Sequence, residues 1–431
     1  MDEIMKKSFF LLIVFILVCS NLYTVKADTL TDPEIHSEGA VLIEANTGNI
    51  LFNKNAKVPM APASTTKIMT AILVLENTKL TDKVLIGKNP PNVDGTAIGV
   101  KEGEEFTVED LLYALLLESA NDAAEALAEH ISGTNENFAK LMNEKAKSIG
   151  CENTNFKNPS GLYEEGHVTT AYDLALMTRE AYKNPVFLKM EDEPFYKIPP
   201  TNITSETRWV NNKNSLILKG SKFFYEKCVG GKTGYTTLSR HTYTAIAEKD
   251  NQKLILAFLD APDKNTYFAD SKNLFEYGFS RYKAVKLFSK GDKVSSYDIN
   301  KDVSIPLLAA SDFYYVEDLN SLGQNDLKDP VGNIHLEDKD LTNVSFNEGD
   351  TIINSRININ EKNVGSLPLY SGITRNVSHL TVAKNSIDKG LSKFKASYVL
   401  TFTGIFLFGT TLIRRKFKQI KRRNKYKKFN I

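Results

Sequence analysis

The chain has 431 residues, 42% of them hydrophobic and 25% charged, and its formal net charge is only +2. This length allows two or three domains of ordinary size, and the composition supplies an ordinary globular core. The near balance of charges argues against a general nucleic-acid-binding protein, which would be strongly basic.

The first 27 residues resemble a secretory signal peptide. Lys6 and Lys7 precede an apolar run at 9–18, and the small-residue sequence VKA at 25–27 offers a cleavage site. We expect cleavage directly after this sequence. The alternative is an uncleaved membrane anchor, because the uncharged stretch continues to residue 25.

Residues 35–284 are expected to mix helices with antiparallel strands. Residues 40–56 read as two strands joined by a turn, and the sequence TVED at 107–110 resembles a capping box that opens a helix. Apolar periodicity and turn residues predict the other elements. They are helices at about 64–76, 122–131 and 171–182, and a hairpin of strands at 242–247 and 254–259.

The residue pattern of the sequence changes near residue 286. Short β-prone runs separated by Gly, Asn and Asp predict a small all-β domain at 285–375. Residues 376–395 carry apolar side chains near helical spacing, which predicts an amphipathic stalk.

The C-terminal region predicts a membrane anchor. Residues 396–413 carry no charge, which is near the about 17–25 apolar residues that span a bilayer. Residues 414–431 follow with ten Lys or Arg and no acid, and positive flanks stay in the cytoplasm. We therefore expect a transmembrane helix at 396–413, a basic cytoplasmic tail, and residues 28–395 on the extracytoplasmic side of the cell membrane. A nucleic-acid arm is the alternative for the tail, and its place beside a membrane span disfavours it.

Cysteine and histidine usage predicts neither a metal nor a cofactor. Cys151 and Cys228 remain after signal removal, and a disulfide between them is possible, although two isolated thiols are more often unpaired. No CxxC or HExxH sequence occurs, and the six His residues are scattered without the spacing of metal ligands.

Three short motifs carry the chemistry of the chain. They are Ser64-Thr-Thr-Lys67, Ser119-Ala-Asn121 and Lys232-Thr233-Gly234. Each motif is weak alone, since a serine can be a helix cap, a lysine a solvated charge and an SxN or KTG sequence a turn. A nucleotide-binding loop at Lys232 is excluded, because it requires glycine where the chain has Glu226.

The spacing of the first motif suits a nucleophile and its base. Residues i and i+3 of a helix share a face, so Lys67 can reach the Ser64 hydroxyl and take its proton. Lys67 must then be neutral, which burial and a nearby cation such as Lys232 would favour. The Ser64 N–H and one from the strand after Gly234 can form an oxyanion hole.

The motifs occur in the order SxxK, SxN, KTG, within or near the sequences PASTTKIMTA, LLLESANDAAEALAEHISG, NPSGL, TTAYDLALMTREA and VGGKTGYT. This pattern resembles the low-molecular-mass penicillin-binding proteins that are D-alanyl-D-alanine carboxypeptidases, serine peptidase family S11. The resemblance covers about residues 35–282. It implies an α+β fold of the transpeptidase and β-lactamase type, an antiparallel sheet flanked by helices. The small β domain and the C-terminal transmembrane helix match the layout of the family more loosely.

The resemblance also implies roles for residues of this chain. Ser64 would be the acylated nucleophile, Lys67 its proton acceptor and Ser119 the shuttle that protonates the leaving D-alanine. Substrate binding would fall to Asn121, which holds the peptide amide, and to the strand Lys232, Thr233, Gly234 and Tyr235. Lys232 and Thr233 would bind the terminal carboxylate, and the Tyr235 N–H would complete the oxyanion hole.

The implied reaction is release of the terminal D-alanine from peptidoglycan pentapeptides, with β-lactam antibiotics as covalent inhibitors. A class A β-lactamase is a rival, but Glu164-Glu165-Gly166-His167 is not its ExxLN deacylation loop. A DD-endopeptidase of the same family uses the same motifs and stays open. A membrane-tethered penicillin sensor or cell-wall binding module also stays open. Cys228 and the sequence TTLSRHTYT after the KTG motif depart from the family pattern and leave the fine substrate preference undecided.

Overall fold

The computed structural model describes residues 31–320, 333–359, 361–377, 410–411, 414–416 and 418. The chain divides into two units, Met1–Val285 with Val316–Lys328, and Lys286–Tyr315 with Asp329–Ile431. This division follows the packing of the chain and does not test the domain limits drawn from the sequence, which remain predictions.

The predicted signal peptide lies outside the described residues. Of the predicted stalk and membrane span, only residues 376, 377, 410 and 411 are described. No helix in the described ranges is both long and apolar enough to cross a membrane, and the span at 396–413 stays a prediction.

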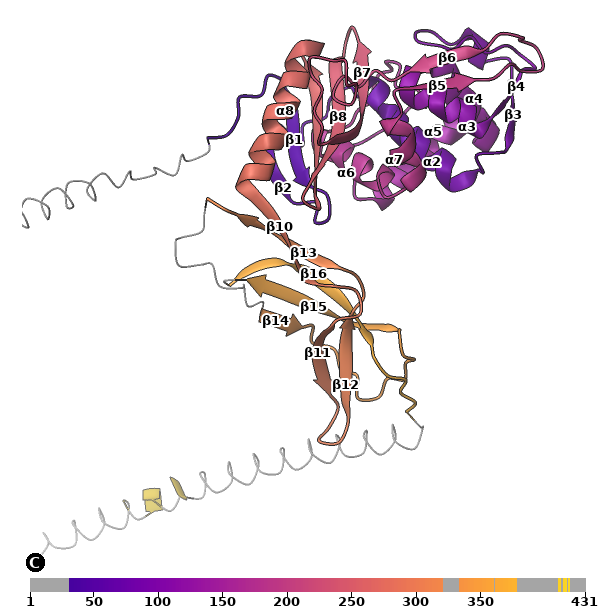
Figure 1. Cartoon of the computed structure of the whole chain (residues 1–431). Helices are drawn as coiled ribbons and strands as arrows, with labels where there is room; N and C mark the ends of the chain where they lie inside the picture. Colours follow the sequence, from indigo (N-terminus) through magenta and orange to yellow (C-terminus); the bar gives the residue numbers. More distant parts are fainter. Residues whose placement is uncertain are drawn as a thin grey trace, which may run out of the picture. The chain divides into compact units, whose positions relative to one another are not determined.

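The first unit is built on a five-stranded antiparallel sheet with the order β2-β1-β9-β8-β7 (Figure 1). Its strands are β1 (Gly39–Glu44), β2 (Ile50–Lys54), β7 (Cys228–Thr236), β8 (Arg240–Lys249) and β9 (Gln252–Ala261). The pairs β1–β2 and β8–β9 confirm the two predicted hairpins. Asp250 and Asn251 join β8 to β9 with φ of 50° and 65°, as a two-residue type I′ turn requires. Because β7 is last in the order, one of its edges is unpaired within this sheet.

Alternate residues of each strand supply two cores on opposite faces of the sheet. In β1, Val41 belongs to the core shared with helices α2 (Lys67–Asn77), α4 (Asn121–Ser132) and α6 (Ala171–Ala181), whereas Leu42 belongs to the core beneath α8 (Lys264–Arg281). Figure 1 shows α8 running along the sheet beside β1 and β8. The helix approaches the sheet closely at Gly278, where a Cβ would lie 2.6 Å from the side chains of Leu42 and Leu254.

The helices of the first unit include those predicted and three that the sequence pattern did not predict. The predicted set is α2 (Lys67–Asn77), α3 (Val108–Tyr113), α4 (Asn121–Ser132) and α6 (Ala171–Ala181), with the short turns η1 (Ala63–Thr66), η2 (Pro90–Asn92) and η3 (Ala114–Glu118) beside them. The capping box is confirmed, since Thr107 and Asp110 bond each other's backbone N–H at the start of α3. The unpredicted helices are α5 (Asn135–Ser148), α7 (Pro185–Asp192) and α8.

Two small hairpins complete the first unit, β3 (Lys83–Leu85) with β4 (Glu105–Thr107), and β5 (Phe195–Ile198) with β6 (Arg208–Asn211). The strands β10 (Tyr282–Phe288) and β13 (Phe313–Asp318) pair with each other and pass from one unit into the other.

The second unit holds a five-stranded sheet with the order β11-β12-β16-β15-β14. Its strands are β11 (Lys293–Asp298), β12 (Ser304–Ala309), β14 (Asn333–Leu336), β15 (Thr351–Ile359) and β16 (Lys362–Ser371). Buried aliphatic side chains such as Ile305, Ile353 and Leu369 form its own core. The residues that concern the chemistry below all lie in the first unit.

Candidate active site

The three sequence motifs meet between the start of α2, the start of α4 and the edge strand β7. Lys67 bonds Ser64 within the first motif, and two further side-chain hydrogen bonds connect the motifs: Lys67 to Asn121, and Lys232 to Ser119. The other predicted site residues follow Lys232 along the same strand: Thr233, Gly234 and Tyr235. The fold thus brings together residues that lie up to about 170 positions apart in a sequence of 431.

Ser64 lies in a tight turn rather than at a helix cap. The residue before it, Ala63, has a φ of +47°, a left-handed conformation that is uncommon outside glycine. Two hydrogen bonds hold the turn, because the hydroxyls of Thr65, within it, and Thr242, on β8, both donate to the Pro62 carbonyl, at 2.6 and 2.7 Å. The first residue before α2 is Thr66, and no side chain caps that helix. The Ser64 side chain is therefore free for chemistry, and it is only half-buried.

Lys67 is completely buried at the first position of α2. Its Nζ donates to Ser64 Oγ at 3.0 Å, to Asn121 Oδ1 at 2.6 Å and to the Ser160 carbonyl at 2.6 Å. Burial lowers the pKa of Lys67 well below its usual value, and the charge of Lys232 lowers it further, against an opposing effect of Asp122. In the neutral amine two N–H groups suffice for the two carbonyl oxygens. The remaining lone pair faces the Ser64 hydroxyl, which is the arrangement of a base and its nucleophile.

The second motif adopts the conformation of a turn and also enters the site. Ser119 ends η3 in the left-handed region, with φ 67° and ψ 33°, and it is half-buried. Its Oγ accepts a hydrogen bond from Lys232 at 2.9 Å. Asn121 begins α4, and its amide spans the site, with Oδ1 on Lys67 and Nδ2 donating to the Asp94 carbonyl at 2.6 Å.

The third motif lies on β7, directly against the turn that holds Ser64. A Cβ at Gly234 would lie 2.8 Å from the Ser64 nitrogen and 2.4 Å from Thr242 Oγ1. Only glycine allows this approach. Lys232 is buried and donates to Ser119 and to the Thr233 carbonyl at 3.0 Å, while Tyr235 is 57% exposed beside the ring of His241.

The free edge of β7 offers backbone donors to a ligand. The Gly231 N–H donates to Glu191 Oε2 at 3.0 Å, so it points away from β8. Donors alternate between the two sides of an antiparallel strand, so the N–H groups of Thr233 and Tyr235 point to the same open side. The Tyr235 N–H is thereby an outward-pointing donor one residue beyond Gly234, the glycine that packs against the Ser64 turn.

Four contributors to the site were missed from the sequence. The Ser160 carbonyl holds Lys67, and Gly161 lies so close behind the Ser64 turn that a Cβ there would be 1.9 Å from the Ala63 oxygen. Nothing in the NPSGL sequence indicates this contact. Glu191 gave no signal at all.

The fourth contributor is His167, which supports the start of α2 through a contact with Thr66. Its Nδ1 accepts the Lys157 N–H at 3.2 Å, so its Nε2–H donates to Thr66 Oγ1 at 2.9 Å. Burial lowers the pKa of His167 to about 4, and the charges of Lys157 and Lys67 act in the same direction. His167 is therefore a neutral structural residue at physiological pH.

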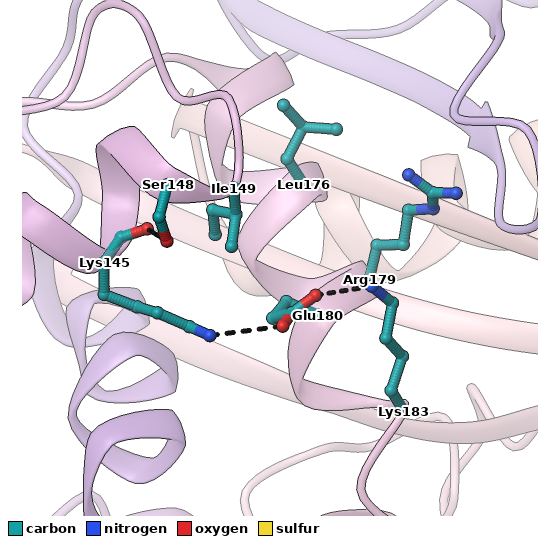
Figure 2. A pocket seen from close by; sticks show the side chains of 7 residues that line it. All are labelled: Lys145, Ser148, Ile149, Leu176, Arg179, Glu180 and Lys183. Atoms are coloured by element: carbon teal, nitrogen blue, oxygen red, sulfur yellow. Dashed lines mark hydrogen bonds and ion pairs between the residues drawn. The ribbon is translucent and has the colours of Figure 1, made fainter. Parts of the chain in front are cut away.

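A surface cavity of about 340 Å³ lies elsewhere, between α5 and α6 (Figure 2). Its one carboxylate already has two partners, since Glu180 pairs with Lys145 at 3.2 Å and with Lys183 at 2.6 Å. None of the motif residues lines it. We therefore place the chemistry at the motif cluster and not in this cavity. Cys151 and Cys228 are buried free thiols, so the possible disulfide is not formed.

Comparison with known proteins follows this geometry. The family described as D-alanyl-D-alanine carboxypeptidase matches residues 26–263. The D-alanyl-D-alanine carboxypeptidase DacF of Bacillus subtilis is 38% identical over 270 residues, covering 62% of this chain and 68% of that protein. The D-alanyl-D-alanine endopeptidase of Escherichia coli is 30% identical over 262 residues, covering 58% and 80%. The crystal structure of penicillin binding protein 5 from Haemophilus influenzae superposes with a TM-score of 0.67 at 26% identity, covering 80% of this chain and 99% of that one.

Proposed function

This chain belongs to the D-alanyl-D-alanine carboxypeptidase family of serine peptidases, and we propose that it removes the terminal D-alanine of peptidoglycan stem peptides through a covalent intermediate on Ser64. The observation that carries the proposal is the 3.0 Å contact between Ser64 Oγ and the fully buried Lys67 Nζ, whose pKa is lowered. A lysine that is neutral near physiological pH can take the serine proton as the hydroxyl attacks.

We propose the following acylation step, which these contacts support. Ser64 Oγ attacks the carbonyl carbon of the penultimate D-alanine while its proton passes to Lys67. The oxygen of the tetrahedral intermediate accepts from the N–H groups of Ser64 and Tyr235, and one such donor is worth about 10²–10³ in rate. The proton then passes through Ser119 to the nitrogen of the leaving D-alanine, the C–N bond breaks, and the acyl group remains on Ser64.

Deacylation uses the same groups in reverse. Water attacks the ester, Lys67 takes a proton from it, and Ser64 regains its hydroxyl as the shortened peptide leaves. We propose that Asn121 orients Lys67 in addition to making the predicted contact with the peptide amide. The support is that Asn121 Oδ1 accepts from Lys67 while its Nδ2 donates to the Asp94 carbonyl.

The substrate is recognised at the KTG strand. The ammonium of Lys232 and the hydroxyl of Thr233 bind the terminal carboxylate, as supported by their neighbouring positions on β7 beside Ser119. The peptide backbone pairs with the open edge of that strand. A β-lactam carries a comparable carboxylate and acylates the same serine, which makes it a covalent inhibitor.

We further propose that the catalytic unit acts outside the cytoplasm, tethered to the cell membrane. The support is the charge-free stretch 396–413 followed by a strongly basic tail, together with the signal-like residues 1–27. Alkaline extraction of membranes that contain the full chain tests the tether: the chain should stay in the pellet, whereas a chain ending at residue 395 should be released.

A D-alanine release assay tests the reaction. The full chain in detergent is incubated with diacetyl-Lys-D-Ala-D-Ala, with S64A beside it. Release by the wild type and none by S64A supports the proposal. Release that survives S64A would overturn the mechanism, and labelling by a fluorescent penicillin without D-alanine release would favour a sensor. Cleavage of a cross-linked dimeric muropeptide in preference to the pentapeptide would indicate endopeptidase activity, the activity for which the E. coli relative is named.

A further inference from the structure

A buried carboxylate lies against the free edge of β7, next to the KTG motif. Glu191, in the last turn of α7, is 1% exposed, and its Oε2 accepts the Gly231 N–H at 3.0 Å. Its Oε1 is buried without a hydrogen-bond partner. An ionised group with an unused oxygen is costly to bury, so its retention beside the active site calls for a role.

Two consecutive glycines allow this carboxylate to approach the strand. At Gly230 a Cβ would lie 3.1 Å from Glu191 Cβ and 2.2 Å from the Tyr182 hydroxyl. At Gly231 a Cβ would lie 2.7 Å from the Thr244 carbonyl. The backbone of β7 is thus bare at the point where α7 packs on it, and the next residue along the strand is Lys232.

Electrostatics couples Glu191 to Lys232. Burial raises the pKa of Glu191, while Lys232 and the Gly231 N–H oppose that rise. Burial lowers the pKa of Lys232, and among the charges that oppose this change Glu191 acts most strongly. Each group therefore favours the charged form of the other.

The surroundings supply no equivalent charge. The titratable groups that act on Lys232, besides Glu191, are Lys213 and Glu118, which pair with each other at 2.7 Å, and Lys67 is the further cation of the site. The groups on which Glu191 acts, besides Lys232, are neutral in their ordinary state: Tyr182, Cys228 and Tyr243.

We propose that Glu191 is a positioning residue that keeps Lys232 in its ammonium form, and so maintains both the cation that binds the substrate carboxylate and the charge that keeps Lys67 neutral. This inference rests on the function proposed above. Without the carboxylate, Lys232 releases its proton at lower pH. The terminal carboxylate then loses its partner, and the repulsion that favours neutral Lys67 disappears.

The test is the pH profile of D-alanine release by the full chain. E191Q keeps an acceptor for the Gly231 N–H and removes only the charge. We expect its alkaline limb to move to lower pH by about one unit, so that release at a pH on that limb falls about tenfold relative to the wild type, with KM affected more than kcat. E191D keeps the charge and should retain the wild-type limb. D192N removes the neighbouring exposed carboxylate and should leave the profile unchanged.

A second variant makes the test independent of how well E191Q folds. Arginine stays protonated at all accessible pH values, so K232R should lose the alkaline limb, whatever its absolute rate. Adding E191Q to K232R should then cause no shift.

Several results would overturn the inference. They are an E191Q profile equal to the wild type, an E191D limb that moves as far as that of E191Q, an equal loss at every pH, or a K232R limb at the wild-type position. If the wild type releases no D-alanine, the proposed function fails instead. The pH dependence of acylation by a fluorescent penicillin then still tests Glu191.

Discussion

Lys232 Nζ lies 2.9 Å from Ser119 Oγ, so the second serine of the site is held by a lysine just as Ser64 is held by Lys67. Both lysines are buried, and the charge of Lys232 contributes to the lowered pKa of Lys67. The favourable state is therefore one neutral and one protonated lysine. This division of charge supports the roles proposed above, proton transfer by Lys67 and anion binding by Lys232.

Replacing Lys67 by arginine should abolish most acylation. The guanidinium stays protonated and cannot act as a base, so we expect the rate of acylation by a fluorescent penicillin to fall by about 10²–10⁴. In the wild type the rate should fall toward acid pH, because Lys67 acts only when deprotonated. K79R, at an exposed position, is the matched control. A K67R enzyme that acylates at the wild-type rate would contradict the role of Lys67.

His167 should make stability depend on pH below neutrality. Its pKa is about 4 in the folded chain and 6.5 in the unfolded one, so the unfolded state binds more protons between these values. The stabilisation is complete above pH 6.5 and is lost as the pH falls to 4, an effect of about 3 kcal/mol. The difference in unfolding free energy between wild type and H167Q should therefore shrink by that amount from pH 7 to 4. H130Q, a substitution of a histidine at an exposed position, is the matched control.

G234A should separate β7 from the Ser64 turn. The added Cβ would lie 2.8 Å from the Ser64 nitrogen, so the strand must move away and the two proposed oxyanion donors lose their spacing. We expect acylation to fall by about 10²–10³, the cost of losing one donor. G220A, where nothing lies within 4 Å, is the control and should acylate as the wild type does. Equal rates for both variants would argue against this oxyanion hole.

G161A should destabilise the fold far more than G150A. Both glycines have positive φ, +83° and +91°, so each substitution carries a backbone cost of about 1–2 kcal/mol. At Gly161 the Cβ would also lie 1.9 Å from the Ala63 oxygen, whereas nothing lies within 4 Å at Gly150. We expect G161A to cost at least about 3 kcal/mol in urea unfolding, and G150A only the backbone term. Similar losses in the two variants would show that the contact with the Ala63 carbonyl has little effect.

The local part of the site could be predicted from the sequence. The contact of Ser64 with Lys67 follows from their spacing at a helix start, and the effect of Lys232 on the pKa of Lys67 follows from the charge of a second lysine. What could not be predicted depends on packing between distant segments. The Ser160 carbonyl and Glu191 reach the motifs through tertiary contacts 93 and 40 residues away in sequence.

Helix α8 escaped prediction for a related reason. Its buried face includes Asp270, Ser271 and Gly278 among the aromatic residues, so no clean apolar stripe marks it. Two of these exceptions have a tertiary cause. Asp270 accepts the His36 N–H at 2.8 Å, and Gly278 allows the close approach to Leu42.

The open edge of β7 is short, and its length limits how many residues of a ligand can pair with it. Upstream, Glu191 occupies the Gly231 N–H; downstream, the strand ends at Thr236, whose N–H turns to Ser239 Oγ at 3.1 Å. Only the outward donors of Thr233 and Tyr235 lie between these stops. An extended ligand can add to the sheet there for about two residues, which is the length of a terminal dipeptide. The same limits leave too few unpaired backbone groups for a strand of another sheet to pair with β7. The edge can therefore bind a short substrate without promoting aggregation.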